Sequence, residues 1–240
     1  MMRALLLLLA CTGCSTVLGI GDLEGPDGGP IPPNDASDGP VPGTIRITGT
    51  VQQVDGISGM SSPLPDAAVS LVAQPTGVGS AAALSDAQGR FELVIETNGI
   101  PLDGALRVAA PNERTTFQYL SRPVVGDVDA SVQIYDEQLF QMVSQMCQPF
   151  EPVTPVFLVF VSDAQNNPVE GAPLSSMPDS TFCSPDASGT FTPTNKSGVG
   201  GVAFNFGLPP GDVTLGTNGA LRTVTAEPQS TVVVPLTQGP

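Results

Sequence analysis

The strongest constraint on the fold is a two-residue alternation of apolar and polar side chains that begins at Thr44. Residues 44–51 read TIRITGTV, so that every second position is apolar or glycine. This period is typical of a strand with one buried face. The chain contains 27 glycines and 25 prolines in 240 residues, and neither residue suits a helix interior. Further apolar runs are separated by turn clusters at 61–66, 85–89 and 98–104. The pattern predicts an antiparallel β-sandwich for residues 44–135.

A second β-rich region is predicted for residues 153–238. PVFLVFVSDAQNNPVEGAPL (155–174) reads as a strand, a turn and the start of another strand. TNKSG (194–198) parallels SDAQG (85–89) and precedes more apolar residues. In contrast, 175–193 has no clear period and reads as a long irregular excursion. The second region is therefore expected to be another sandwich with one large loop.

Residues 136–147, DEQLFQMVSQMC, form the one convincing helical stretch. Leu139, Phe140, Val143 and Cys147 fall on one face at helical spacing, and Asp136 can cap the first turn. Such an apolar stripe usually docks a helix onto a core. We therefore predict a helical connector over 136–152.

The first region resembles a known family. TGTV (48–51), PLPDAAVSL (63–71) and SDAQGRFEL (85–93) are similar in order and character to a carboxypeptidase regulatory-like domain. The resemblance covers about 44–135 and implies a transthyretin-type β-sandwich. Residues 153–238 resemble a regulatory-like or bacterial immunoglobulin-like sandwich. The expected fold class is all-β, with two antiparallel immunoglobulin- or transthyretin-like sandwich domains in tandem, after a signal peptide and a disordered linker.

The first fourteen residues, MMRALLLLLACTGC, have the layout of an export signal: a basic residue, a short apolar core and small residues before a cysteine. The segment is similar to the bacterial lipobox, whose cysteine receives diacylglycerol. Cys14 is preferred as the lipidated residue, with signal peptide 1–13, and Cys11 is the alternative. Ser15 is not the Asp that usually retains lipoproteins in the inner membrane. The resemblance therefore implies a lipid anchor in the outer membrane.

Residues 14–43 are expected to be a disordered acidic linker. The part that reads GDLEGPDGGPIPPNDASDGPVPG is nearly free of apolar side chains, so it cannot bury enough surface to offset the entropy of ordering. Its acidic residues lack the spacing of a calcium-binding loop. The linker is expected to act as a solvated spacer.

Cleavage before Cys14 would leave Cys147 and Cys183 as an even pair in an oxidising compartment. Cys147 ends the predicted helix and Cys183 lies in the excursion. We therefore predict a disulfide between them, which would close a loop of about 36 residues.

The sequence offers no recognisable catalytic, cofactor or metal site. It has no histidine and a single lysine, Lys196, among 23 acidic residues and a net charge of −15. Imidazole chemistry and a basic face for nucleic acid are therefore excluded. The glycine-rich stretches 77–82 and 198–203 are interpreted as turns, because neither links a strand to a helix. Asp127 and Asp129 are interpreted as a solvated strand edge.

These observations favour a non-enzymatic, membrane-anchored lipoprotein with a structural or adhesive role. Its expected partners are the membrane, through the lipid, and an envelope protein or a glycan. Two alternatives stay open: a carbohydrate-binding module, or an accessory subunit of an exported enzyme or transporter. The absence of Trp weakens the carbohydrate alternative, because sugars are usually stacked on flat aromatic rings.

Overall fold

The computed structural model describes residues 40–55, 59–73, 77–147, 149 and 151–238, which form two compact units. The N-terminal unit holds the described residues up to Val54 and Ser61–Ile134; the C-terminal unit holds those from Tyr135 onward, with Asp55, Gly59 and Met60. Short strands dominate both units, so the all-β prediction is confirmed. Cys11, Cys14 and most of the predicted linker lie outside the described residues.

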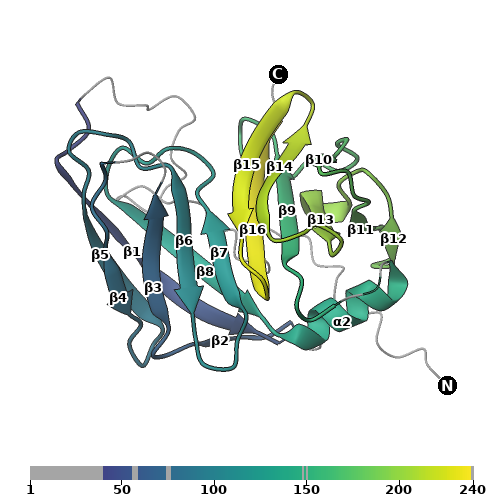
Figure 1. Ribbon diagram of the computed structural model, residues 1–240, viewed down its shortest axis with the longest axis horizontal. Helices are drawn as coiled ribbons and strands as arrows, with labels where there is room; N and C mark the ends of the chain where they lie inside the picture. Colours follow the sequence, from purple (N-terminus) through teal and green to yellow (C-terminus); the bar gives the residue numbers. More distant parts are fainter. Residues whose placement is uncertain (1–39, 56–58, 74–76, 148, 150, 239–240) are drawn as a thin grey trace. The chain divides into compact units, whose positions relative to one another are not determined.

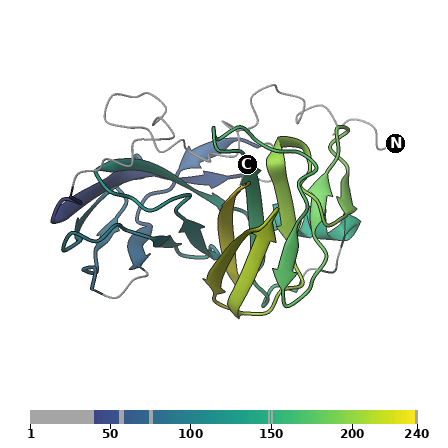
Figure 2. The same ribbon diagram turned by 90° about the horizontal axis from the view of Figure 1, so that it is seen from above.

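The N-terminal unit is a sandwich of two sheets. One layer has the order β2-β1-β5, and β8 also pairs with β1; the other has the order β4-β3-β6-β7. The two layers can be followed in Figures 1 and 2. The alternation expected of a strand with one buried face is also visible in β5, where Phe91, Leu93 and Ile95 are buried and the residues between them are exposed. The strands are β1 (Thr44–Val54), β2 (Ser61–Pro63), β3 (Ala68–Ala73), β4 (Ala82–Leu84), β5 (Arg90–Glu96), β6 (Gly104–Ala109), β7 (Thr115–Tyr119) and β8 (Val128–Tyr135).

The C-terminal unit is also a two-layer sandwich. One layer has the order β12-β11-β13-β9-β16 and the other the order β10-β14-β15. Strand β9 is buried along almost its whole length, as its continuous apolar run VFLVFV requires. Its elements are α2 (Glu137–Met146), β9 (Val156–Ser162), β10 (Ser175–Met177), β11 (Cys183–Pro185), β12 (Phe191–Pro193), the 3-10 turn η1 (Val199–Gly201), β13 (Val202–Asn205), β14 (Gly211–Thr217), β15 (Ala220–Ala226) and β16 (Ser230–Thr237).

The predicted helix is present as α2 and belongs to the C-terminal unit. The Asp136 side chain accepts a hydrogen bond from the Leu139 backbone N–H at 3.0 Å and so caps the first turn. Phe140 and Val143 are fully buried, which confirms the predicted docking face. None of the described helices is both long and apolar enough to cross a bilayer.

The two units repeat one strand arrangement. In the N-terminal unit, β1 pairs with β5 and β8, while β6 pairs with β3 and β7. In the C-terminal unit, β9 pairs with β13 and β16, while β14 pairs with β10 and β15. The order along the chain is the same in both. The chain therefore contains the same sandwich topology twice.

A buried serine hydroxyl joins two loops in the N-terminal unit. The Ser85 hydroxyl donates to the Leu64 carbonyl at 2.7 Å and accepts from the Ala67 N–H at 2.9 Å. Four residues later, Gly89 has a φ of 72°, and a Cβ there would overlap the Val51 carbonyl. The hydroxyl satisfies backbone groups that the turn takes out of the sheet.

The C-terminal unit has the same arrangement at Ser197. Its hydroxyl donates to the Val169 carbonyl at 2.6 Å and accepts from the Ala172 N–H at 3.0 Å. Gly201, four residues later, has a φ of 71°. The structural counterpart of SDAQG (85–89) is therefore 197–201, and the sequence parallel with 194–198 is wrong by three residues. The two loop contacts of the Ser197 hydroxyl identify this equivalence. The residue types of TNKSG (194–198) do not reveal it.

The excursion between β10 and β13 is held to the C-terminal unit by three devices. Its hairpin, β11 and β12, extends the sheet beyond β13. The fully buried Asn205 donates to the Thr181 carbonyl at 3.0 Å and accepts from the Ser180 hydroxyl at 3.2 Å. Cys147, after α2, is joined to Cys183 in a disulfide with 5.9 Å between their Cα atoms. The predicted pairing is confirmed.

Carboxylates shape two exposed turns of the C-terminal unit. Asp163 accepts from the backbone N–H groups of Gln165 and Asn167, both at 2.8 Å. Asp186 accepts from the Ser188 hydroxyl at 2.6 Å and from the backbone N–H groups of Ser188 and Thr190. Side-chain donation, from Asn167 to Asp163 and from the Ser188 hydroxyl to Asp186, is the largest cause that lowers each pKa below the ordinary 3.8.

Replacing Ser197 or Ser85 by alanine is expected to lower the free energy of unfolding by about 1–3 kcal/mol, because a buried N–H and carbonyl lose their partner. Urea unfolding of the purified chain measures the change. Ser175→Ala, on the exposed face of β10, is the matched control and is expected to change little. An equal loss at Ser175, or none at Ser197 and Ser85, would contradict the role of the hydroxyls.

Replacing Cys147 and Cys183 together by serine is expected to lower the free energy of unfolding by about 3–4 kcal/mol, since the unfolded chain regains the entropy of a 36-residue loop. Chemical unfolding with and without a dithiol reductant checks this. The reductant should destabilise the unsubstituted chain and leave the double variant unchanged. A double variant as stable as the unsubstituted chain would refute the expectation.

Carbon-13 NMR titration is expected to place the pKa of the Asp186 carboxyl below 3.8. Because the folded-state pKa is lowered, the carboxylate stabilises the turn above the unfolded pKa, and this contribution is lost as the pH falls through the folded one. Ser188→Ala removes the largest cause and should raise the pKa toward 3.8. Asn167→Ala should do so for Asp163 and leave Asp186 unchanged. A pKa of Asp186 that stays the same in the Ser188→Ala variant would refute this account.

Candidate functional site

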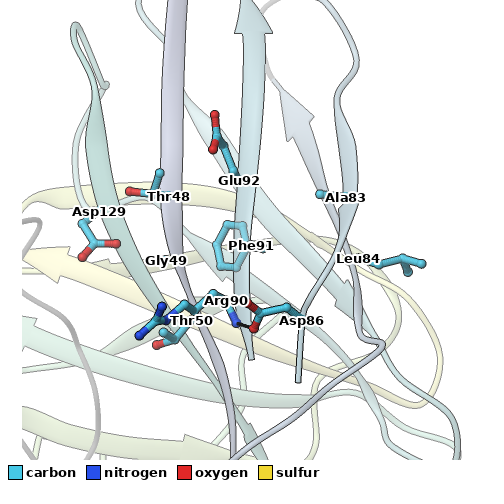
Figure 3. A pocket seen from close by; sticks show the side chains of 10 residues that line it. All are labelled: Thr48, Gly49, Thr50, Ala83, Leu84, Asp86, Arg90, Phe91, Glu92 and Asp129. Atoms are coloured by element: carbon cyan, nitrogen blue, oxygen red, sulfur yellow. Dashed lines mark hydrogen bonds between the residues drawn. The ribbon is translucent and has the colours of Figure 1, made fainter. Parts of the chain in front are cut away.

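The candidate site is a pocket of about 560 Å³ on the N-terminal unit, open to solvent and lined by hydroxyl, charged and apolar side chains. Residues from β1, β4, β5 and β8 and from the turn before β5 line it, so segments up to 81 positions apart in the sequence meet there. In Figure 3, Asp129 and Leu84 lie at opposite ends of the pocket, with β1 and β5 between them. The lining residues are Thr48, Gly49, Thr50, Ala83, Leu84, Asp86, Arg90, Phe91, Glu92 and Asp129.

Strand alternation decides which side chains reach the pocket. Along β1, Thr48 and Thr50 point outward because Ile47 and Val51 are buried. In the register of the sheet, Thr48 lies opposite Glu92, and Thr50 lies opposite Arg90. The outer face of these strands is therefore a surface of hydroxyl and charged groups.

Gly49 allows β1 and β8 to approach each other closely. A Cβ on Gly49 would overlap the carbonyl of Ala130, and it would lie 3.1 Å from the Phe91 ring. Glycine is used where another backbone comes this near. This closeness brings Asp129 of β8 to the edge of the pocket.

The charges of the pocket are mostly negative. Asp86, Glu92 and Asp129 supply three carboxylates, and Arg90 supplies one guanidinium. Arg46 approaches Glu92 with 3.1 Å between Nε and Oε1, and both side chains are about half exposed. Asp86 also holds the turn before β5, since its Oδ1 accepts from the N–H groups of Gln88 and Arg90. An open pocket of this kind can recognise cationic and hydrogen-bonding groups.

The structure brings few of the sequence-predicted residues into this site. Of the acidic pair, Asp129 lines the pocket, whereas Asp127 accepts from the Arg46 backbone N–H at 2.8 Å. Lys196 is exposed, and its backbone forms an isolated antiparallel β-bridge with Pro173 in the C-terminal unit. Among the described residues, no three Cys, Asp or Glu side chains are grouped as metal ligands.

The sequence does not reveal the pocket, because its residues belong to four separate strands and one turn. Only the alternation in β1 and β5 signals that Thr48, Thr50, Arg90 and Glu92 share an exposed face. Nothing in the sequence pairs them with Leu84 or Asp129.

Aromatic rings offer no exposed stacking surface in the part of the chain that is described. Tyr119 and Tyr135 are buried, and burial raises the pKa of the Tyr135 phenol well above its ordinary 10.0. The phenylalanines there are buried too, with at most 8% of any of them exposed. Sugar binding by aromatic stacking therefore has no platform among these residues.

No protein-family model matches the chain, and no curated protein does. Similar solved structures include the Bacillus anthracis TIE protein, at 15% identity and a TM-score of 0.23, covering 80% of this chain and 33% of that one. A 9R-lipoxygenase from Cyanothece matches at 17% identity and a TM-score of 0.25; the match covers 41% of this chain and 17% of the lipoxygenase. A shaft pilin from Lactobacillus rhamnosus GG matches at 11% identity and a TM-score of 0.26; the match covers 82% of this chain and 98% of the pilin. The chain thus spans a third or less of the first two proteins. At these scores the matches do not bear on what it does.

Proposed function

We propose that this chain is a non-enzymatic lipoprotein of the cell envelope, anchored in the outer membrane through Cys14, with a structural or adhesive, protein-binding role. The observation that carries the proposal is that one sandwich topology occurs twice, and that in both units polar side chains hydrogen-bond to the backbone of the loops. The Ser85 and Ser197 hydroxyls each join two loops, and the Asp86, Asp163 and Asp186 carboxylates each shape a turn.

Rigid sandwiches whose polar side chains are hydrogen-bonded to their loops suit a protein that presents a surface to a partner. The disulfide between Cys147 and Cys183 adds to this rigidity and fits an oxidising compartment outside the cytoplasm. The expected anchor explains how an acidic chain of net charge −15 is kept at a membrane whose anionic headgroups repel it. The acidic segment 14–43 would then set the distance between the lipid and the first sandwich.

A carbohydrate-binding role receives no specific support, because the described aromatic rings are buried. An accessory role beside an exported enzyme or transporter is one form of the proposed protein binding. Co-purification of a single enzyme or transporter complex with the detergent-solubilised protein would identify that form.

Intact-mass measurement of the mature protein is expected to show a chain that begins at Cys14, carries a lipid on Cys14 and is two hydrogens lighter than its reduced form because of the disulfide. Cys14→Ser should abolish the lipid and release the protein from the membrane fraction, whereas Cys11→Ser should leave both unchanged. A lipid on Cys11, or no lipid, would refute the anchor at Cys14. Turnover of esters, peptides or glycosides by the purified mature chain would refute the non-enzymatic role.

A further inference from the structure

Strand β5 has an outer edge that no described strand pairs with. It is the last strand in the order β2-β1-β5, with β1 on its inner side. An unpaired strand edge presents a row of N–H and C=O groups that can pair with another chain. β5 has seven residues, RFELVIE, and contains no proline to block such pairing.

Hydrogen bonds at both ends of β5 show which of its backbone groups face outward. The Arg90 carbonyl accepts from the Asp86 N–H at 2.9 Å, and the Glu96 carbonyl accepts from the Gly79 N–H at 2.8 Å, both on the outer side. Alternate residues of a strand direct their backbone groups to the same side. Between these two ends, the backbone groups of Glu92 and Val94 therefore point outward.

Strand β4 presents a second open edge across the pocket. The Ala81 carbonyl accepts from the Leu71 N–H, and the Ser85 N–H donates to the Ala67 carbonyl, so these residues face β3. By the same alternation, the backbone groups of Ala82 and Leu84 point away from β3. No described strand pairs with that side. The pocket is lined by Ala83 and Leu84 from β4 and by Arg90–Glu92 from β5, so it lies along both edges.

Among the described edge strands, three are guarded by a proline at or beside one end, whereas β4 and β15 have none. Pro63 ends β2, Pro193 ends β12 and Pro178 follows β10. Proline lacks the N–H that a neighbouring strand requires. β5 has no such guard, and two apolar side chains are exposed beside its edge: Val94 is 54% exposed, and Leu84 is 66% exposed.

We propose that the outer edge of β5 is an acceptor for an extended, basic segment of a partner protein, which adds to the sheet as one more strand. The inference rests on the proposed protein-binding role and gives it a surface. The added strand would bond to the backbone groups of Glu92 and Val94. One row of its side chains would face Leu84, and the other would lie beside Val94 and Glu92, the latter at the pocket.

Charge decides the chemistry of that segment. The pocket holds the carboxylates of Asp86, Glu92 and Asp129 and the guanidinium of Arg90, and Arg46 pairs with Glu92 from beside it, so one negative charge is in excess. The chain as a whole has a net charge of −15. A segment that alternates apolar and cationic side chains matches both the exposed apolar groups and the negative field.

The test uses the mature chain and a ten-residue peptide of alternating valine and lysine as the probe. The peptide should bind and slow the amide exchange of Glu92 and Val94. A peptide with the same lysines, in which proline replaces every valine, has equal charge and cannot form a ladder. It should bind less tightly and leave these amides unprotected. A peptide of alternating valine and glutamate should also bind less tightly.

Val94→Pro removes one outward N–H and leaves the pairing with β1 intact, so it should weaken binding by about fivefold, the effect of one hydrogen bond. Two further variants keep the N–H in case the proline variant misfolds. Val94→Lys should weaken binding of the lysine peptide and Val94→Glu should strengthen it, each by about two- to fivefold.

Three outcomes would overturn the proposal. The first is that the lysine peptide fails to bind, or binds no better than its proline counterpart. The second is binding that leaves the Glu92 and Val94 amides unprotected and ignores the substitutions at Val94. The third is dimerisation of the chain through β5, seen by sedimentation and abolished by Val94→Pro. An envelope protein that crosslinks to the chain regardless of Val94 would leave the proposed function standing and remove only this site.

Discussion

The N-terminal sandwich depends on the burial of one row of side chains from each layer, whereas β9 of the C-terminal sandwich is buried on both faces. In β1, Ile45, Ile47 and Val51 are fully buried, and Leu93 and Ile95 of the neighbouring β5 are almost so. Each such side chain contributes roughly 1.5–3 kcal/mol through removal of apolar surface from water. Because successive residues point to opposite faces, this burial also fixes which side chains lie outside. The hydroxyl and charged groups of the pocket are on the surface because their neighbours are in the core.

Burial of the strands creates a second requirement at the loops. Where the chain turns out of a sheet, its N–H and C=O groups lose their ladder partners and must find others. The Ser85 and Ser197 hydroxyls meet this need at equivalent places in the two units. The recurrence of a serine, a positive-φ glycine four residues later and the same two loop contacts shows that the two units solve one problem in one way.

The units differ mainly in the segment that comes after their equivalent strands β3 and β10. In the N-terminal unit a short connection leads through β4 to Ser85. In the C-terminal unit the excursion with β11 and β12 occupies this place, held by Asn205 and the disulfide. β4 leaves an open edge beside the pocket, whereas the edge strand β12 ends in Pro193. The proposed acceptor edge is thus a feature of one unit and not of the shared topology.

The sequence by itself determined the strand-rich class, the exposed and buried faces of β1 and β5, the helix capped by Asp136 and the pairing of Cys147 with Cys183. These features depend on local periodicity, capping chemistry and cysteine count, which need no knowledge of distant residues. Only the tertiary structure decided that Ser197 matches Ser85, because each hydroxyl is defined by partners 18 to 28 positions away. It also decided that Leu84 and Asp129 share a pocket and that β5 ends its sheet. Alternation says which face of a strand is buried, but the choice of neighbouring strand is made by contacts between distant segments.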